Sequence, residues 1–216
     1  MKGQFLHFFV FFLLFLSLSS EAGAQEQRFR AALVAGLNAA QIRGDASAGY
    51  NKLGLRGGLR GIVLLTNRTE ASIDILFSQR GAQTERRIGN VNPPRTIQLD
   101  YIEVPIMFHL KDWLDDEETY YRVTAHGGLS FGRLFRADAF DISVLETEVD
   151  NFAEVDVSFT LGATYHLSDN FGLSALYTRS FNRLYDNRDF TDDLGIPRFP
   201  FPLLGFFLTF QGVYTF

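Results

Sequence analysis

The chain has 216 residues, enough for one domain of ordinary size, and carries a formal net charge of −5. This acidic balance argues against a nucleic-acid-binding protein, and the absence of cysteine excludes disulfides and thiolate chemistry. Hydrophobic residues make up 46% of the chain, yet the mean hydropathy is only +0.01, which argues against a bundle of membrane-spanning helices.

The N-terminus has the features of a cleavable signal peptide. Lys2 gives a positive start, residues 5–16 form an apolar run, and Ala22-Gly23-Ala24 supply a small-residue cleavage site. A membrane anchor is the alternative, but the run is short for a helical span of about 20 residues. We therefore expect residues 1–24 to be removed and residues 25–216 to form an exported domain.

From residue 29 onward, apolar residues alternate with polar or small ones, which is the period-two pattern of β-strands. The pattern predicts strands over residues 29–38, 53–63, 70–78, 97–110, 121–132, 155–166, 171–178 and 203–216. Their connections alternate between long loops (39–51, 80–96, 137–153 and 182–200) and short turns (66–68, 112–119 and 168–170). This layout is typical of an all-β, eight-stranded antiparallel transmembrane β-barrel with short periplasmic turns and longer outer loops.

The distribution of charge predicts which face of the barrel meets lipid. One face of each strand is apolar and has no charge at its centre, whereas the other face carries most of the charged residues. Eight uncharged apolar faces would be insoluble in water, so we expect them to contact hydrocarbon in the cell outer membrane. Aromatic residues near the strand ends are then expected to form two girdles, the outer one comprising Phe77, Phe131, Tyr177 and Phe206.

The interior of an eight-stranded barrel is just wide enough to be filled by side chains. We expect a lumen charge cluster made of Arg56, Arg60, Asp74, Glu103, Arg122 and His126. Such a cluster is either a conduction path with a proton-linked gate or a salt-bridge plug. The narrow interior favours the plug, in which opposite charges satisfy one another.

Turn lengths predict parts of the strand register. A three-residue turn at 66–68 sets Arg60 opposite Asp74, and a three-residue turn at 168–170 sets His166 opposite Gly172. For the fourth and fifth strands, pairing residues that share a face places Pro105 near His126, with Glu103 diagonal to it.

A lipid-modifying enzyme is one alternative, because Ser130, His126 and Glu103 share the inward face of their strands. A catalytic triad is recognised by the geometry of its side chains, and the mere presence of the three residue types does not establish one. A lipid-modifying enzyme also needs a nucleophile that is accessible from the bilayer. The sequence contains no metal-ligand spacing and no phosphate-binding loop. We therefore expect no catalytic residues, no metal and no cofactor.

Two predicted outer loops carry opposite charges. Loop 80–96 contains Arg80, Arg86, Arg87 and Arg95. Loop 137–153 contains Asp138, Asp141, Glu146, Glu148 and Asp150. These residues either bind lipopolysaccharide phosphates or a protein partner, or are solvated charges that attract one another; we favour the second interpretation.

Two segments carry a family resemblance. Ile75-Leu76-Phe77-Ser78-Gln79-Arg80-Gly81 and Leu99-Asp100-Tyr101-Ile102-Glu103-Val104-Pro105 resemble the signature of the PorT-like outer-membrane β-barrel family of Bacteroidetes. The resemblance extends over about residues 29–216, and the Tyr-Ile-Glu-Val-Pro box is its most specific part. It implies an eight-stranded outer-membrane barrel; the founding member is tied to type IX protein secretion. No catalytic residues come with the family.

The last strand ends on Tyr214-Thr215-Phe216, which we expect to be the C-terminal assembly signal, formed by Tyr214 and Phe216, that the barrel-insertion machinery reads. The sequence as a whole predicts a small, non-enzymatic outer-membrane protein with a plugged lumen. Its expected partners are outer-membrane lipid or lipopolysaccharide, the insertion machinery and a secretion-system protein. The alternatives are a type IX secretion accessory, a narrow channel and the lipid-modifying enzyme.

Overall fold

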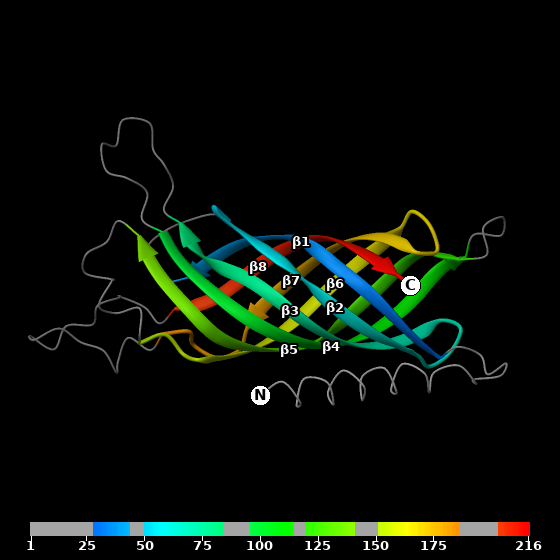
Figure 1. Cartoon of the computed structure of the whole chain (residues 1–216), viewed down its shortest axis with the longest axis horizontal. Coiled ribbons are helices and arrows are strands. Elements are labelled where there is room, and N and C mark those ends of the chain that lie inside the picture. The colour runs from blue at the N-terminus through cyan, green and yellow to red at the C-terminus, as the bar shows by residue number, and fades with distance from the viewer. Residues whose placement is uncertain (1–27, 44–49, 84–95, 115–119, 141–150, 186–202) are drawn as a thin grey trace, which may run out of the picture.

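The computed structural model describes residues 28–43, 50–83, 96–114, 120–140, 151–185 and 203–216 (Figure 1). The expected signal peptide at residues 1–24 lies outside these ranges. Among the described residues, no helix is both long enough and apolar enough to cross a membrane.

The described chain forms one closed barrel of antiparallel strands (Figure 1). In chain order the strands are β1 (Phe29–Arg43), β2 (Lys52–Leu64), β3 (Thr69–Gln83), β4 (Thr96–Leu114), β5 (Tyr121–Phe140), β6 (Val155–His166), β7 (Phe171–Ser180) and β8 (Leu204–Thr215). Each strand pairs with its neighbours in sequence, and β8 closes the barrel against β1. The predicted eight-stranded antiparallel barrel is confirmed.

Burial alternates along the strands with the predicted polarity. On β2, Leu55 and Leu59 are 59% and 63% exposed, whereas Arg56 and Arg60 are only 5% and 6% exposed. Successive side chains of a strand point to opposite faces, so the exposed apolar residues cover the outside and the arginines point into the lumen. The outer surface of the barrel is therefore apolar, as a lipid-facing surface must be.

Glycine between the two lumen arginines lets neighbouring strands approach closely. A Cβ atom at Gly58 would meet the backbone carbonyl oxygen of Ile75 on β3, well inside van der Waals contact. Gly61 faces outward, and a Cβ there would lie 3.7 Å from the nearest atom, which is ordinary contact. A side chain is therefore excluded at Gly58 but tolerated at Gly61.

Several strands continue further at the outer end than predicted. β3 runs to Gln83 and β5 to Phe140, so Arg80 lies in a strand and the expectation of Arg80 in a loop is wrong. Gly81 falls within the predicted loop 80–96, but it pairs with Gln98 within the β3–β4 ladder. Gly81 has a φ of 145°, and a Cβ there would clash with the carbonyl oxygen of Ile97. This glycine therefore permits close strand pairing and does not end the strand.

The register predictions have mixed outcomes. Arg60 pairs with Asp74, and His166 pairs with Gly172, as the two three-residue turns predicted. The prediction for β4 and β5 is wrong: Pro105 pairs with Ser130, and His126 pairs with His109. β4 continues to Leu114, so the chain reverses about two residues later than expected. A reversal two residues later shifts every pair by four residues.

Candidate functional site

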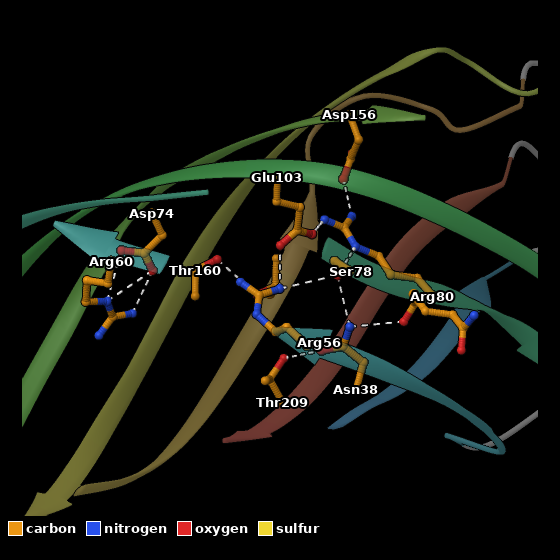
Figure 2. A network of polar contacts seen from close by, with 12 residues as sticks. Asn38, Arg56, Arg60, Asp74, Ser78, Arg80, Glu103, Asp156, Thr160 and Thr209 are labelled. Atoms are coloured by element: carbon orange, nitrogen blue, oxygen red, sulfur yellow. Dashed lines mark hydrogen bonds and ion pairs between the residues drawn. The ribbon is translucent and has the colours of Figure 1, made fainter. Parts of the chain in front are cut away.

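The centre of the lumen holds a network of buried ion pairs. Arg56 on β2 pairs with Glu103 on β4 (Figure 2). Arg80 on β3 pairs with the same carboxylate and also with Asp156 on β6. None of these four side chains is more than 6% exposed. The network thus crosses the interior from β2 to β6.

Two aromatic rings hold the Arg80 guanidinium in place. Its central carbon lies 4.7 Å from the ring centre of Tyr101 and 4.3 Å from that of Phe207. Tyr101 comes from β4 and Phe207 from β8, so the guanidinium lies between opposite parts of the barrel wall. A cation at these distances is attracted by the ring faces, in addition to its ion pairs.

A second ion pair lies beside the network. Nε of Arg60 donates to both carboxylate oxygens of Asp74 at 2.9 and 3.1 Å, and Nη2 donates at 2.8 Å (Figure 2). The two residues are directly opposed on β2 and β3. This two-oxygen geometry is the strongest arrangement available to an arginine and a carboxylate.

The lumen ion pairs balance in charge. Arg56, Arg60 and Arg80 provide three positive charges, and Asp74, Glu103 and Asp156 provide three negative charges. Removing a charge from water is costly unless an opposite charge and hydrogen bonds compensate it. The balance therefore lets these charged side chains remain buried in the interior.

Neutral hydrogen bonds extend the network to the strands that close the barrel. Nδ2 of Asn38 on β1 donates to Ser78 Oγ at 3.0 Å, and Thr209 Oγ1 on β8 donates to Asn38 Oδ1 at 2.7 Å (Figure 2). Ser78 Oγ also accepts from Arg56 at 3.4 Å. The β1–β8 seam is thus connected to the charged centre.

A layer of histidines lies on the periplasmic side of the ion pairs. The ring centres of His109 and His126 are 5.2 Å apart. Nε2 of His109 lies 2.8 Å from Ser72 Oγ, and Nε2 of His126 lies 3.0 Å from Thr164 Oγ1. Within the described part of the chain, no group of three or more His, Cys, Asp or Glu side chains is arranged to hold a metal ion.

Below the histidines, a cavity of about 300 Å³ opens at the end of the barrel that carries the short turns. We call it the periplasmic vestibule, because short turns mark the periplasmic side of such barrels. Its walls include Arg30, Glu70, His109, Lys111 and His166, and Glu70 pairs with Lys111.

The opposite end of the lumen is filled by apolar side chains. This apolar cap comprises Ile42, Ala82, Ile97, Leu99, Tyr101, Phe152, Leu184, Tyr185 and Leu203. Backbone bonds connect its segments: Ala153 N donates to Leu184 O, and Leu184 N donates to Leu203 O, both at 2.8 Å. A cavity of about 10 Å³ between the cap and Arg80 is scarcely large enough for a water molecule. Among the described residues, the lumen thus contains a cavity at the periplasmic end and packed apolar side chains at the outer end.

Comparison with known proteins identifies the family. The family model of the outer membrane protein beta-barrel domain matches residues 23–186. The chain belongs to this family. It is a small β-barrel protein of the outer membrane, and the family match does not distinguish a PorT-like branch or a source phylum. No curated protein matches the chain.

Solved structures similar to this family member are outer-membrane barrels. Ail, the attachment invasion locus protein of Yersinia pestis, has 12% identity and a TM-score of 0.47 over 88% of this chain and 99% of its own. Neisserial surface protein A has 9% identity and a TM-score of 0.44 over 87% and 97%. OprG from Pseudomonas aeruginosa has 11% identity and a TM-score of 0.42 over 87% and 94%.

The expected charge cluster is only partly assembled. Arg56 with Glu103, and Arg60 with Asp74, form two neighbouring ion-paired groups, and His126 lies in the histidine layer. Arg122 lies instead near the periplasmic end of β5, where Nη1 donates to the Tyr165 hydroxyl at 3.3 Å. The sequence pattern places Arg122 on the inward face of β5. Because β5 begins at residue 121, Arg122 lies at the end of the strand and not beside the central ion pairs.

The alternative Ser-His-acid set is not assembled as a triad. Ser130 Oγ has no hydrogen-bond partner in the described structure, and Nδ1 of His126 has none either. Ser130 pairs in the ladder with Pro105, while Glu103 binds the arginines. The three residues therefore share a lumen without sharing hydrogen bonds.

The expected charge cluster omitted Arg80, Asp156 and His109, which the structure places in the site. Arg80 continues the inward alternation of Asp74 and Ser78, and that parity was the available signal. His109 needed the correct β4–β5 register. Of the predicted loop charges, Asp138 lies on β5 and pairs with Arg136 at 2.6 Å. The remaining loop charges, from Arg86, Arg87, Arg95, Asp141, Glu146, Glu148 and Asp150, lie outside the described residues.

Proposed function

We propose that this protein is a membrane-embedded structural or accessory component whose lumen is plugged by its own side chains. The charge-balanced network of Arg56, Arg80, Glu103 and Asp156 is the observation that supports this most strongly. A water-filled pore needs charges that face solvent, whereas these side chains are almost completely buried and face one another. The eight-stranded interior is also too narrow for an open channel.

The apolar cap at the outer end of the lumen also supports the proposal of a plugged lumen. A polar solute that passed the ion pairs would still meet buried Leu99, Leu184 and Tyr185 at the outer end. Transfer of a polar group into such surroundings costs several kcal/mol unless it is hydrogen-bonded. The proposed role therefore assigns binding to the exterior of the barrel and to the periplasmic vestibule, and not to a route through the lumen.

An accessory role in protein secretion, of the type IX kind, is the more specific form of this proposal. It predicts a protein partner in the periplasm or outer membrane. Crosslinking in intact cells through a photoreactive residue at Asn67, on the wall of the vestibule, followed by purification tests it. A reproducible crosslinked protein supports the accessory role. A chain that is always recovered alone contradicts it, and a photoreactive residue at lipid-facing Leu59 is the matched control.

We further propose that the protein is not an enzyme. The separation of Ser130, His126 and Glu103 into different contacts supports this, because nucleophilic catalysis needs a base within hydrogen-bond reach. Lipid A extracted from a strain that lacks the gene should have the same mass spectrum as wild-type lipid A. A missing or additional acyl or phosphate group in the deletion strain would contradict the proposal.

A further inference from the structure

A groove of about 350 Å³ lies on the outside of the barrel, near the ends of β1, β7 and β8 that lead into the long connections. Its lining residues are Gln41, Tyr50, Tyr177, Arg179, Leu204 and Phe206. These strand residues alternate with inward-facing neighbours such as Thr178, Ser180 and Phe207, which are almost completely buried. The groove therefore faces the lipid and is separate from the lumen.

The groove is built by strand pairing. Phe206 on β8 pairs with Gln41 on β1 and with Arg179 on β7, so the three side chains form a row across the outer face. Tyr50 packs edge-on against Phe206, with ring centres 5.6 Å apart. Tyr177 is two residues before Arg179 and points to the same face. The Arg179 guanidinium is therefore flanked by aromatic rings and by the amide of Gln41.

Aromatic side chains also flank the other side of Arg179. On β6 its ladder partner is Phe159, whose ring lies 5.5 Å from that of Phe181 and 6.1 Å from that of Tyr177. Aromatic side chains gather at the level of lipid headgroups. Arg179 is therefore in the interfacial layer of the outer leaflet, where its aliphatic stem can lie on apolar surface and its guanidinium can reach phosphate.

Arg179 differs from the other exposed arginines near this end. Arg133 donates to Glu154 at 3.1 Å, and Arg136 pairs with Asp138 at 2.6 Å. Within the described part of the chain, no carboxylate forms an ion pair with Arg179. An exposed guanidinium on a lipid-facing surface needs an anion, and the anions at that depth are lipid phosphates.

We propose that this groove binds a phosphorylated glycolipid of the outer leaflet, of the lipid A type. The phosphate binds the Arg179 guanidinium through two N–H groups, the geometry that arginine offers to phosphate. Gln41 and the hydroxyls of Tyr50 and Tyr177 are suited to sugar hydroxyls, and the acyl chains follow Leu204, Phe206 and the apolar face below them. This inference is independent of the plugged lumen.

Native mass spectrometry of the detergent-solubilised barrel, titrated with bis-phosphorylated lipid A, tests the proposal. Arg179→Gln should weaken lipid A binding about tenfold, because it removes a charge-assisted pair of hydrogen bonds. Arg133→Gln removes the same charge from a paired arginine near the same end and should change binding less than about twofold. Equal binding by the Arg179→Gln and Arg133→Gln variants would overturn the proposal.

Three further ligands test the choice of occupant. Lipid A without phosphates should bind the wild type as weakly as lipid A binds Arg179→Gln. Phosphatidylglycerol or inorganic phosphate that bound as tightly as lipid A would overturn the assignment to a glycolipid. A difference in gel mobility between boiled and unboiled samples reports folding of each variant. If Arg179→Gln does not fold, Tyr50→Ala removes one wall of the groove, and unchanged lipid A affinity of that variant would overturn the proposal.

Discussion

Breaking the Arg60–Asp74 pair offers a quantitative test of the plug. Asp74→Asn keeps the shape of the side chain but removes the charge that Arg60 contacts at 2.8, 2.9 and 3.1 Å. Both residues are buried, so the change leaves an uncompensated guanidinium in the lumen. Removal of one partner of a buried pair costs about 3–5 kcal/mol, which is a large part of the roughly 5–15 kcal/mol that stabilises a typical domain.

A double-mutant cycle separates the pair from the effects of each substitution. Arg60→Met should also cost about 3–5 kcal/mol, because it leaves a buried carboxylate unpaired. The variant with both changes has no unpaired charge, so it should be more stable than the sum of the single effects predicts, by about 2–3 kcal/mol. A coupling of that size would show that the two side chains compensate one another inside the barrel.

Urea unfolding in lipid vesicles measures these differences. Trp113 is the single tryptophan of the chain and lies near the periplasmic end of β4, so its fluorescence reports loss of the membrane-embedded barrel. Arg133→Met is the matched control, because the Arg133–Glu154 pair is about three-quarters exposed and should contribute less than about 1 kcal/mol. Single variants at Arg60 and Asp74 that cost no more than this control, or effects that simply add, would refute the reasoning.

Three more predictions concern the close strand approach at Gly58, the Arg80 guanidinium between two aromatic rings, and the terminal residue Phe216. Gly58→Ala should lower the yield of folded barrel strongly, because its Cβ would clash with β3, whereas outward-facing Gly61→Ala should fold normally. The folded fraction is measured by the change in gel mobility on boiling, and equal folded fractions for the two variants would contradict the close approach. Arg80→Gln should destabilise the barrel by about 3 kcal/mol or more in the same urea assay, because it leaves buried Asp156 without its cation and Glu103 with Arg56 alone; an effect below about 1 kcal/mol would contradict its central position. Phe216→Ala should slow assembly into the outer membrane, measured by protease protection after induction, and unchanged kinetics would reduce the aromatic ending to a girdle residue.

The sequence was sufficient to predict the barrel because inward and outward positions differ in chemistry. Leu59 beside Arg60, repeated along each strand, gives a period of two that survives without any knowledge of tertiary contacts. Short turns also determined register, since a three-residue turn leaves one way to oppose Arg60 and Asp74. The polarity of the two faces followed from the same charges.

The sequence was insufficient where alternation weakens. In the apolar cap, inward residues such as Ile97 and Leu99 are as apolar as outward ones, so the pattern no longer distinguishes strand from loop. Glycine is typical of loops, so Gly81 favours the predicted loop 80–96, whereas the structure uses it for close strand pairing. The β4–β5 turn has no glycine or proline to mark its centre. A two-residue error there separated His109 from its actual partner His126.

Single-channel recording in planar bilayers tests the central claim most directly. The purified, heat-modifiable barrel should give no conductance steps in 1 M salt at any applied voltage that the bilayer tolerates, because the ion pairs and the apolar cap close the lumen. A Glu103→Ala variant is the companion sample. It lacks the carboxylate between Arg56 and Arg80, so the packing of its lumen is loosened. Reproducible, uniform conductance steps from the wild-type protein would contradict a plugged barrel.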